Sequence, residues 1–127
     1  MSKPVILVVE DSEELRKVVE RALVRQGYRV VVAGDGAAAL EVLRTSPVDL
    51  LITDVLMPGR DGIETLVEVQ DQFPALPVIV MSGGGLLEPE VYLDSAAGLG
   101  ARRTLAKPFR LTELFEATRE ALESGAA

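Results

Sequence analysis

The chain has 127 residues, enough for one domain of ordinary size and too few for two. It contains neither cysteine nor histidine, which excludes disulfides, thiol nucleophiles, Ser-His-Asp catalysis and metal sites with thiolate or imidazole ligands. The net charge of −7, with no basic tract, argues against nucleic-acid binding by this chain alone.

Five short apolar runs alternate with helical patterns along the chain, and each run is typical of a buried strand. The expected strands are residues 5–9, 30–33, 50–53, 78–81 and 104–106. The expected helices lie between residues 12 and 27, over 37–44, between 61 and 74, over about 89–99, and from about 112 onward. Five βα units with right-handed crossovers predict an α/β fold, a doubly wound five-stranded parallel sheet with helices on both faces.

Three of the expected helices carry apolar residues at the spacing of one helix face. In the first helix this face comprises Leu15, Val18, Val19, Ala22 and Leu23, and Gly27 is expected to end the helix. In the third helix it comprises Ile63, Leu66 and Val67, and in the last Leu111, Leu114, Phe115, Thr118 and Leu122. We expect these faces to be the buried sides of the helices.

Polar side chains follow four of the expected strands: Glu10 and Asp11 the first, Asp54 the third, Ser82 the fourth and Lys107 the fifth. The carboxyl ends of parallel strands meet at one edge of the sheet, where such sheets bind ligands. Clustered carboxylates repel one another unless they are protonated or bound to a cation, and Mg²⁺ suits an all-oxygen site. Taken singly, each acid is also explained as a helix cap or turn residue, and Ser82 as a turn residue.

Together these residues resemble the receiver domain of two-component response regulators, over nearly the whole chain. The resemblance is carried by the pair Glu10-Asp11, by Asp54 and the Met-Pro-Gly-Arg-Asp-Gly segment at 57–62, by Ser82, by Gly100-Ala101 and by Lys107-Pro108-Phe109. It implies a flavodoxin-like fold with strand order 2-1-3-4-5 and five helices.

The resemblance also implies a role for each acid. Asp54 would be the phosphoacceptor, because a carboxylate can attack phosphorus to give an aspartyl phosphate. Mg²⁺, with Mn²⁺ as an alternative ion, would be held by Asp11 and Asp54, by Glu10 through water, and by the backbone carbonyl of Leu56.

Ser82 and Lys107 would bind the phosphoryl group, and the Lys107–Pro108 peptide would be cis. The segment between Ser82 and Lys107 departs from the family, because it is longer than usual and has Thr104 where family members usually carry an aromatic residue. Tyr92, on the expected fourth helix, would either replace that aromatic residue in coupling phosphorylation to signalling or be an ordinary packed helix residue.

The implied function is that of a single receiver domain over residues 1–127, with a frayed tail at about 124–127. It would accept a phosphoryl group on Asp54 from a partner histidine kinase or histidine phosphotransfer protein. It would signal through contacts with an unidentified downstream protein, without turning over a substrate. No apolar run is long enough for a signal peptide or a membrane span, so we expect a cytoplasmic protein without a membrane partner.

Two alternatives remain open for the function. One is a phosphorylation-independent adaptor on the same fold. The other is an aspartyl-nucleophile phosphohydrolase of the haloacid dehalogenase type, which would need a second acid two residues after the nucleophile, where this chain has Leu56. The sequence is equally consistent with a full-length protein and with a domain excised from a longer regulator.

Overall fold

The computed structural model describes residues 3–54, 62–82 and 103–125. The elements in chain order are β1 (Val5–Val9), α1 (Glu13–Arg25), β2 (Arg29–Ala33), α2 (Gly36–Thr45), β3 (Leu50–Asp54), α3 (Gly62–Gln72), β4 (Val78–Ser82), β5 (Arg103–Ala106) and α5 (Leu111–Gly125). Each expected strand is present, as is each expected helix that falls on these residues. The helix expected over 89–99 lies outside them. No helix in the described ranges is both long and apolar enough to cross a membrane.

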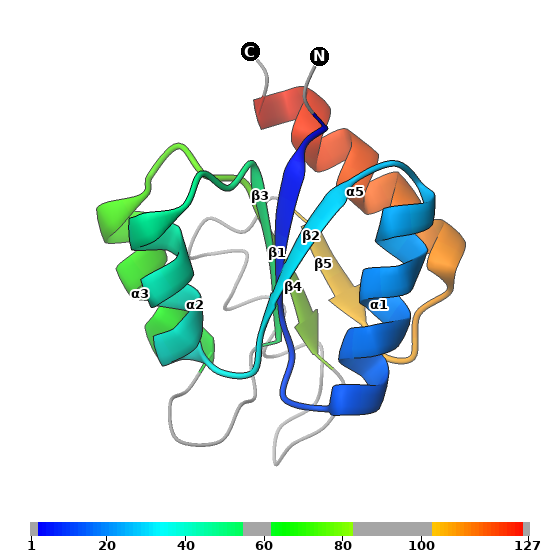
Figure 1. The fold of residues 1–127 in the computed structure, drawn as a ribbon, viewed down its shortest axis with the longest axis horizontal. Helices are drawn as coiled ribbons and strands as arrows, with labels where there is room; N and C mark the ends of the chain where they lie inside the picture. The colour runs from blue at the N-terminus through cyan, green and yellow to red at the C-terminus, as the bar shows by residue number, and fades with distance from the viewer. Residues whose placement is uncertain (1–2, 55–61, 83–102, 126–127) are drawn as a thin grey trace.

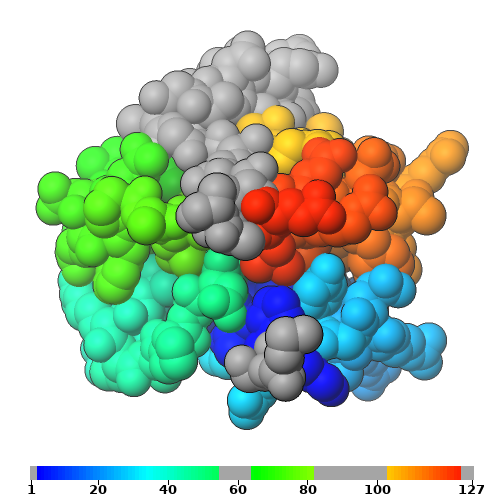
Figure 2. All heavy atoms as spheres, turned by 90° about the horizontal axis from the view of Figure 1, so that it is seen from above, coloured from blue at the N-terminus to red at the C-terminus, as the bar shows by residue number. Residues whose placement is uncertain are grey.

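The strands form one parallel sheet in the order β2-β1-β3-β4-β5, which confirms the predicted fold class. Helices α2 and α3 cover one face, and α1 and α5 cover the other (Figure 1). All strands run in the same direction, so their carboxyl ends form one edge, at the bottom of Figure 1. At the opposite edge, the start of β1 lies beside the end of α5 (Figures 1 and 2).

The central strands are buried on both faces. In β1, Leu7 and Val9 pack in the core between the sheet and α2 and α3, whereas Ile6 and Val8 pack in the core beneath α1 and α5. Successive side chains of a strand point to opposite faces, so a strand covered on both sides needs an apolar residue at every position. This explains why the apolar runs that form β1, β3 and β4 are continuous rather than alternating. The expectation of a buried strand is wrong for β2, which lies at the edge of the sheet and leaves Val31 and Val32 exposed.

Local sequence signals set the ends of the first two helices. Ser12 is the N-cap of α1, and Asp35 is the N-cap of α2 with its Oδ1 accepting a hydrogen bond from Ala38 N at 2.8 Å. Gly27 follows α1 with a φ of 96°, in the left-handed region that favours glycine. The expectation that Gly27 ends the first helix is therefore confirmed.

The buried helix faces are narrower than the spacing predicts. Val18, Val67 and Leu111 belong to the expected faces, but their exposed fractions are 51%, 48% and 42%. In α1 the fully buried neighbour is Val19, at 0%. A helix surface curves away from a flat sheet, so residues at the border of an apolar stripe do not reach the core.

Adjacent valines in α1 provide a matched test of this packing. Val19→Ala should lower the free energy of unfolding by about 2 kcal/mol, because it removes buried methyl groups and leaves a cavity. Val18→Ala removes the same atoms from an exposed position and should change it by less than about 0.5 kcal/mol. Urea unfolding of both variants measures the difference, and equal effects would contradict the assigned helix orientation.

Candidate functional site

The register of β1 against β3 brings together the carboxylates at the ends of these strands. Val9 pairs with Thr53, so the next residues, Glu10 and Asp54, reach the carboxyl edge at the same level. One carboxylate oxygen from each of Glu10, Asp11 and Asp54 lies within 4.8 Å of the others. The structure therefore brings the three acids together at one edge of the sheet.

Lys107 joins this cluster from the position just after β5, a strand that lies two places from β3 in the sheet. Its Nζ lies 2.8 Å from Asp54 Oδ2 and 2.5 Å from Glu10 Oε1. Because β4 lies between β3 and β5, the lysine side chain crosses the end of β4, where Ser82 is the last strand residue. The Lys107–Pro108 peptide is cis, as the resemblance implies.

Glu10 is held through its backbone and both of its carboxylate oxygens. Its side chain accepts hydrogen bonds from Lys107 Nζ and, at 3.0 Å, from Ser12 N. Its backbone nitrogen donates to Ala33 O at 3.1 Å, and its carbonyl oxygen accepts from Arg16 Nη1 at 2.9 Å. With 1% of its surface exposed, Glu10 is a fixed part of the site rather than a mobile acid.

The electrostatics of the cluster follow from burial and from the lysine. Burial raises the pKa of Glu10, and the Asp11 and Asp54 carboxylates add to this, although Lys107 and the Ser12 N–H oppose it. Burial alone would lower the pKa of Lys107, but its hydrogen bonds to Asp54 and Glu10 outweigh that effect and raise it. Lys107 is therefore charged near neutral pH and offsets part of the repulsion between the acids.

The three acids fit a hard divalent cation. Carboxylate oxygens are the ligands that Mg²⁺ prefers, and one exposed acid leaves room for the waters that this ion retains. Asp11 is that exposed acid, whereas both Glu10 oxygens already accept hydrogen bonds from the protein. Asp11 is thus more accessible to an ion than Glu10.

The remaining residues expected at the site are placed as follows. Ser82 ends β4 at the carboxyl edge, Thr104 lies partly buried in β5, and Pro108 is exposed. Leu56 and Tyr92 lie outside the described residues, so the carbonyl ligand and the replacement aromatic stay predictions.

Sequence reasoning did not single out Arg16, although its side chain bonds to the backbone of Glu10. The sequence did contain a pattern that could have indicated this contact. The dipole of a helix disfavours positive charge near its N-terminus, and Arg16 lies within the first turns of a helix that starts at the carboxyl edge. A basic residue there, beside an acidic cluster, indicates a specific contact.

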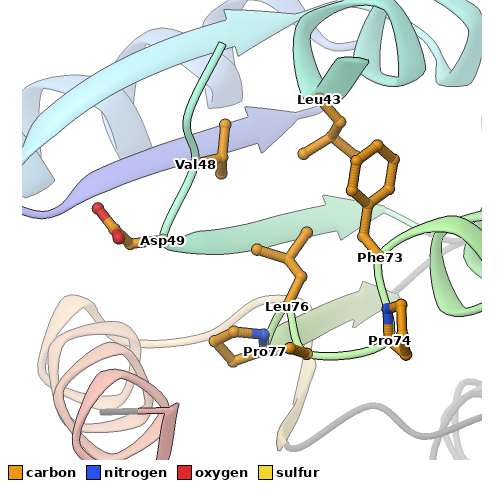
Figure 3. Close-up of a pocket in the computed structure, with 8 residues that line it drawn as sticks. Leu43, Val48, Asp49, Phe73, Pro74, Leu76 and Pro77 are labelled. Atoms are coloured by element: carbon orange, nitrogen blue, oxygen red, sulfur yellow. The ribbon is translucent and has the colours of Figure 1, made fainter. Parts of the chain in front are cut away.

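A separate cavity of about 380 Å³ lies at the amino edge of the sheet, between the segments that lead into β3 and β4 (Figure 3). Its walls are mainly apolar and comprise Leu43, Val48, Phe73, Pro74, Ala75, Leu76 and Pro77. The one carboxylate among its lining residues is Asp49, whose Oδ2 accepts a hydrogen bond from Val5 N at 2.8 Å. Apart from Asp49, no ionisable side chain lines this cavity. The carboxyl edge, where three acids and a lysine meet, is therefore the candidate site.

The class of protein follows from comparison with known families. Residues 6–119 match the family described as response regulator receiver domain. The parallel sheet of order 2-1-3-4-5 agrees with this match. The chain belongs to the response regulator receiver domain family.

Among curated proteins, the chain is similar to the DNA-binding transcriptional regulator NtrC of Escherichia coli K12, with 37% identity over 113 residues, or 89% of this chain and 24% of NtrC. It is 36% identical over 121 residues to the transcriptional regulatory protein GlrR of the same strain, covering 95% of this chain and 27% of GlrR. The chain therefore spans about a quarter of the length of these relatives.

Solved structures show the same likeness. The structure of NtrX from Brucella abortus superposes with a TM-score of 0.91 and 31% identity, covering 98% of this chain and 28% of that one. A CheY-like receiver domain protein from Methanospirillum hungatei JF-1 superposes with a TM-score of 0.89 and 25% identity, covering 98% of both chains.

The different surroundings of Asp11 and Glu10 predict a ranking of metal affinities. Asp11→Ala should weaken Mg²⁺ binding by on the order of tenfold or more, because it removes the exposed acid that we expect to contact the ion directly. Glu10→Ala should weaken it less, because Glu10 is expected to act through water. Calorimetric Mg²⁺ titration measures both, with exposed Glu41→Ala as the control for losing one negative charge. The reverse ranking would contradict the assignment.

Proposed function

We propose that this chain is a phosphoacceptor receiver of a two-component or phosphorelay pathway, in which Asp54 is phosphorylated by a partner histidine kinase or histidine phosphotransfer protein. The observation that carries the proposal is the geometry around Asp54. A buried carboxylate stands beside two further acids that could hold a cation, and its Oδ2 accepts a hydrogen bond from the Lys107 ammonium. Membership of the receiver family supports the same assignment.

The proposed transfer balances within the two partners. A carboxylate oxygen of Asp54 attacks the phosphorus atom, a P–O bond forms, and the P–N bond to the partner's imidazole breaks with its electron pair returning to the ring nitrogen. Bound Mg²⁺ would offset the repulsion between the anionic donor and the acidic site and neutralise charge in the transition state. Asp11 and Asp54 would hold the ion directly, with Glu10 through water and the Leu56 carbonyl completing the protein ligands.

Lys107 would then report the modification. In the unmodified protein its ammonium bonds to Asp54 Oδ2, an oxygen that phosphorylation alters or crowds. The same ammonium can donate a charge-assisted hydrogen bond to an oxygen of the new phosphoryl group, with the Ser82 hydroxyl as a second donor. This exchange of partners would change the end of β5 whenever Asp54 is modified.

We further propose that residues 1–127 act as one receiver domain whose targets are proteins. The net charge of −7 supports this, because an acidic surface repels nucleic acid. NtrC is described as DNA-binding, but this chain matches 24% of its length. The proposed output is therefore a contact with another protein or domain, and no substrate is turned over.

Phosphorylation should require Asp54. In phosphoramidate or acetyl phosphate with Mg²⁺, intact-mass measurement should show one acid-stable, base-labile phosphoryl group on the wild-type chain and none on Asp54→Asn. Asp49→Asn, an exposed acid at the opposite edge, is the matched control and should be labelled normally. Labelling of Asp54→Asn would overturn the assignment of Asp54 as the nucleophile. A folded wild type that is not labelled would favour the alternative function of a phosphorylation-independent adaptor.

Lys107→Ala should separate phosphorylation of Asp54 from the structural change that follows it. Some Asp54 labelling should remain, because the nucleophile and the candidate metal ligands are intact. The amide chemical shifts that phosphorylation changes should become confined to the neighbourhood of Asp54, as measured by NMR. Lys17→Ala, which removes an exposed lysine paired with Glu13, should respond like the wild type. A wild-type response from Lys107→Ala would disprove the reporting role.

A further inference from the structure

The side chain of Arg16 lies beside two residues that directly follow strands, Glu10 after β1 and Gly34 after β2. From α1 it turns back toward the carboxyl edge, and its Nη1 donates to the carbonyl oxygen of Glu10, just past β1, at 2.9 Å. The same nitrogen is 3.5 Å from where a Cβ would stand on Gly34, the residue that follows β2. A Cβ at this position would be in ordinary van der Waals contact with the guanidinium, so Arg16 lies directly beside the turn after β2.

We propose that Arg16 is a positioning residue of the acidic site, which fixes the peptide between Glu10 and Asp11 and thereby aims Asp11 at Asp54. The inference rests on the proposed function, because it assigns Arg16 to the same metal site. The hydrogen bond of Arg16 is to the backbone of Glu10 rather than to a carboxylate of the cluster. Arg16 acts through the backbone that carries Asp11.

The backbone geometry makes this action specific. A peptide unit is planar, so a hydrogen bond that fixes the carbonyl of Glu10 also fixes the nitrogen of Asp11. The nitrogen of Glu10 is held by Ala33 O, and its side chain by Lys107 and by Ser12 N. The Arg16 bond holds the one remaining polar group of Glu10. Asp11 itself is exposed, so its direction depends on the backbone that precedes it.

A guanidinium suits this task better than an ammonium would. A charged donor makes a stronger hydrogen bond to a carbonyl than a neutral donor does. The planar fork of arginine is also more rigid than the flexible stem of lysine, so less freedom is lost when the bond forms. Arg16 is partly buried, which shields the bond from competing water.

Charge and geometry predict opposite effects for the loss of Arg16. If Arg16 acted only through its charge, its removal would strengthen cation binding, because like charges repel. If it positions Asp11, its removal should weaken cation binding, since groups that orient metal ligands typically contribute 10–100-fold in affinity. The sign of the change therefore distinguishes the two roles.

Mn²⁺ binding followed by electron paramagnetic resonance tests the proposal without any phosphoryl transfer. Arg16→Met keeps an apolar stem and removes the donor, and should weaken Mn²⁺ binding about tenfold. If the Arg16→Met variant does not fold, Arg16→Ala serves as the test variant in its place. Arg21→Ala removes an equal charge from an exposed position of the same helix and should change affinity less than about twofold. Unchanged or tighter binding by the folded Arg16 variant would overturn the proposal.

A double-mutant cycle with Asp11 separates positioning from general destabilisation. If Arg16 acts through Asp11, Arg16→Met should cost almost no further Mn²⁺ affinity in an Asp11→Ala background. An equal loss in both backgrounds would show a merely structural role and disprove the proposal.

The cycle also keeps two failures distinct. A folded wild type that binds no Mn²⁺ would refute the proposed metal site itself. A wild type that binds Mn²⁺ through Asp11, with an Arg16 variant that binds equally well, would refute the role of Arg16 alone.

Discussion

Three carboxylates held at one edge of a sheet repel one another, and the ammonium of Lys107, which pairs with Glu10 and Asp54, offsets part of this repulsion. The contact also ties the last strand to the first and third. Glu10 and Asp54 cannot move apart, because β1 and β3 are paired along their length and Glu10 is buried. An edge that is acidic, rigid and only partly neutralised is suited to receive a cation together with an anionic group.

The rigidity of that edge comes from burial of the sheet on both faces. Side chains such as Ile6 and Leu7, next to each other in sequence, lie in different cores and leave β1 no freedom to slide. If β1 slid by one residue along β3, the side chains that now face one core would face the other. Glu10 would also move by one residue relative to Asp54. The register that packs the cores is thus the register that aligns Glu10 with Asp54.

The sequence predicted the parts of this arrangement that follow from periodicity. Continuous apolar runs predicted the strands, and parallel strands place the residues after them, including Asp54 and Lys107, at one edge. The strand order came from resemblance, because local patterns do not record which strands pair. Exposure of Val18 and the bond from Arg16 to the Glu10 carbonyl depend on helix rotation and side-chain reach, which one-dimensional spacing does not encode.

The bond between Glu10 and Lys107 joins residues 97 positions apart. Closing so long a loop costs chain entropy, so contacts of this kind tend to form late in folding. A chain in which only β1, β2 and β3 had assembled would hold the acids together without the lysine that offsets their charge. Docking of β5 therefore completes the sheet and relieves the electrostatic stress in the same event. If the carboxyl edge binds a phosphoryl group as proposed, only chains that have finished folding would be able to do so.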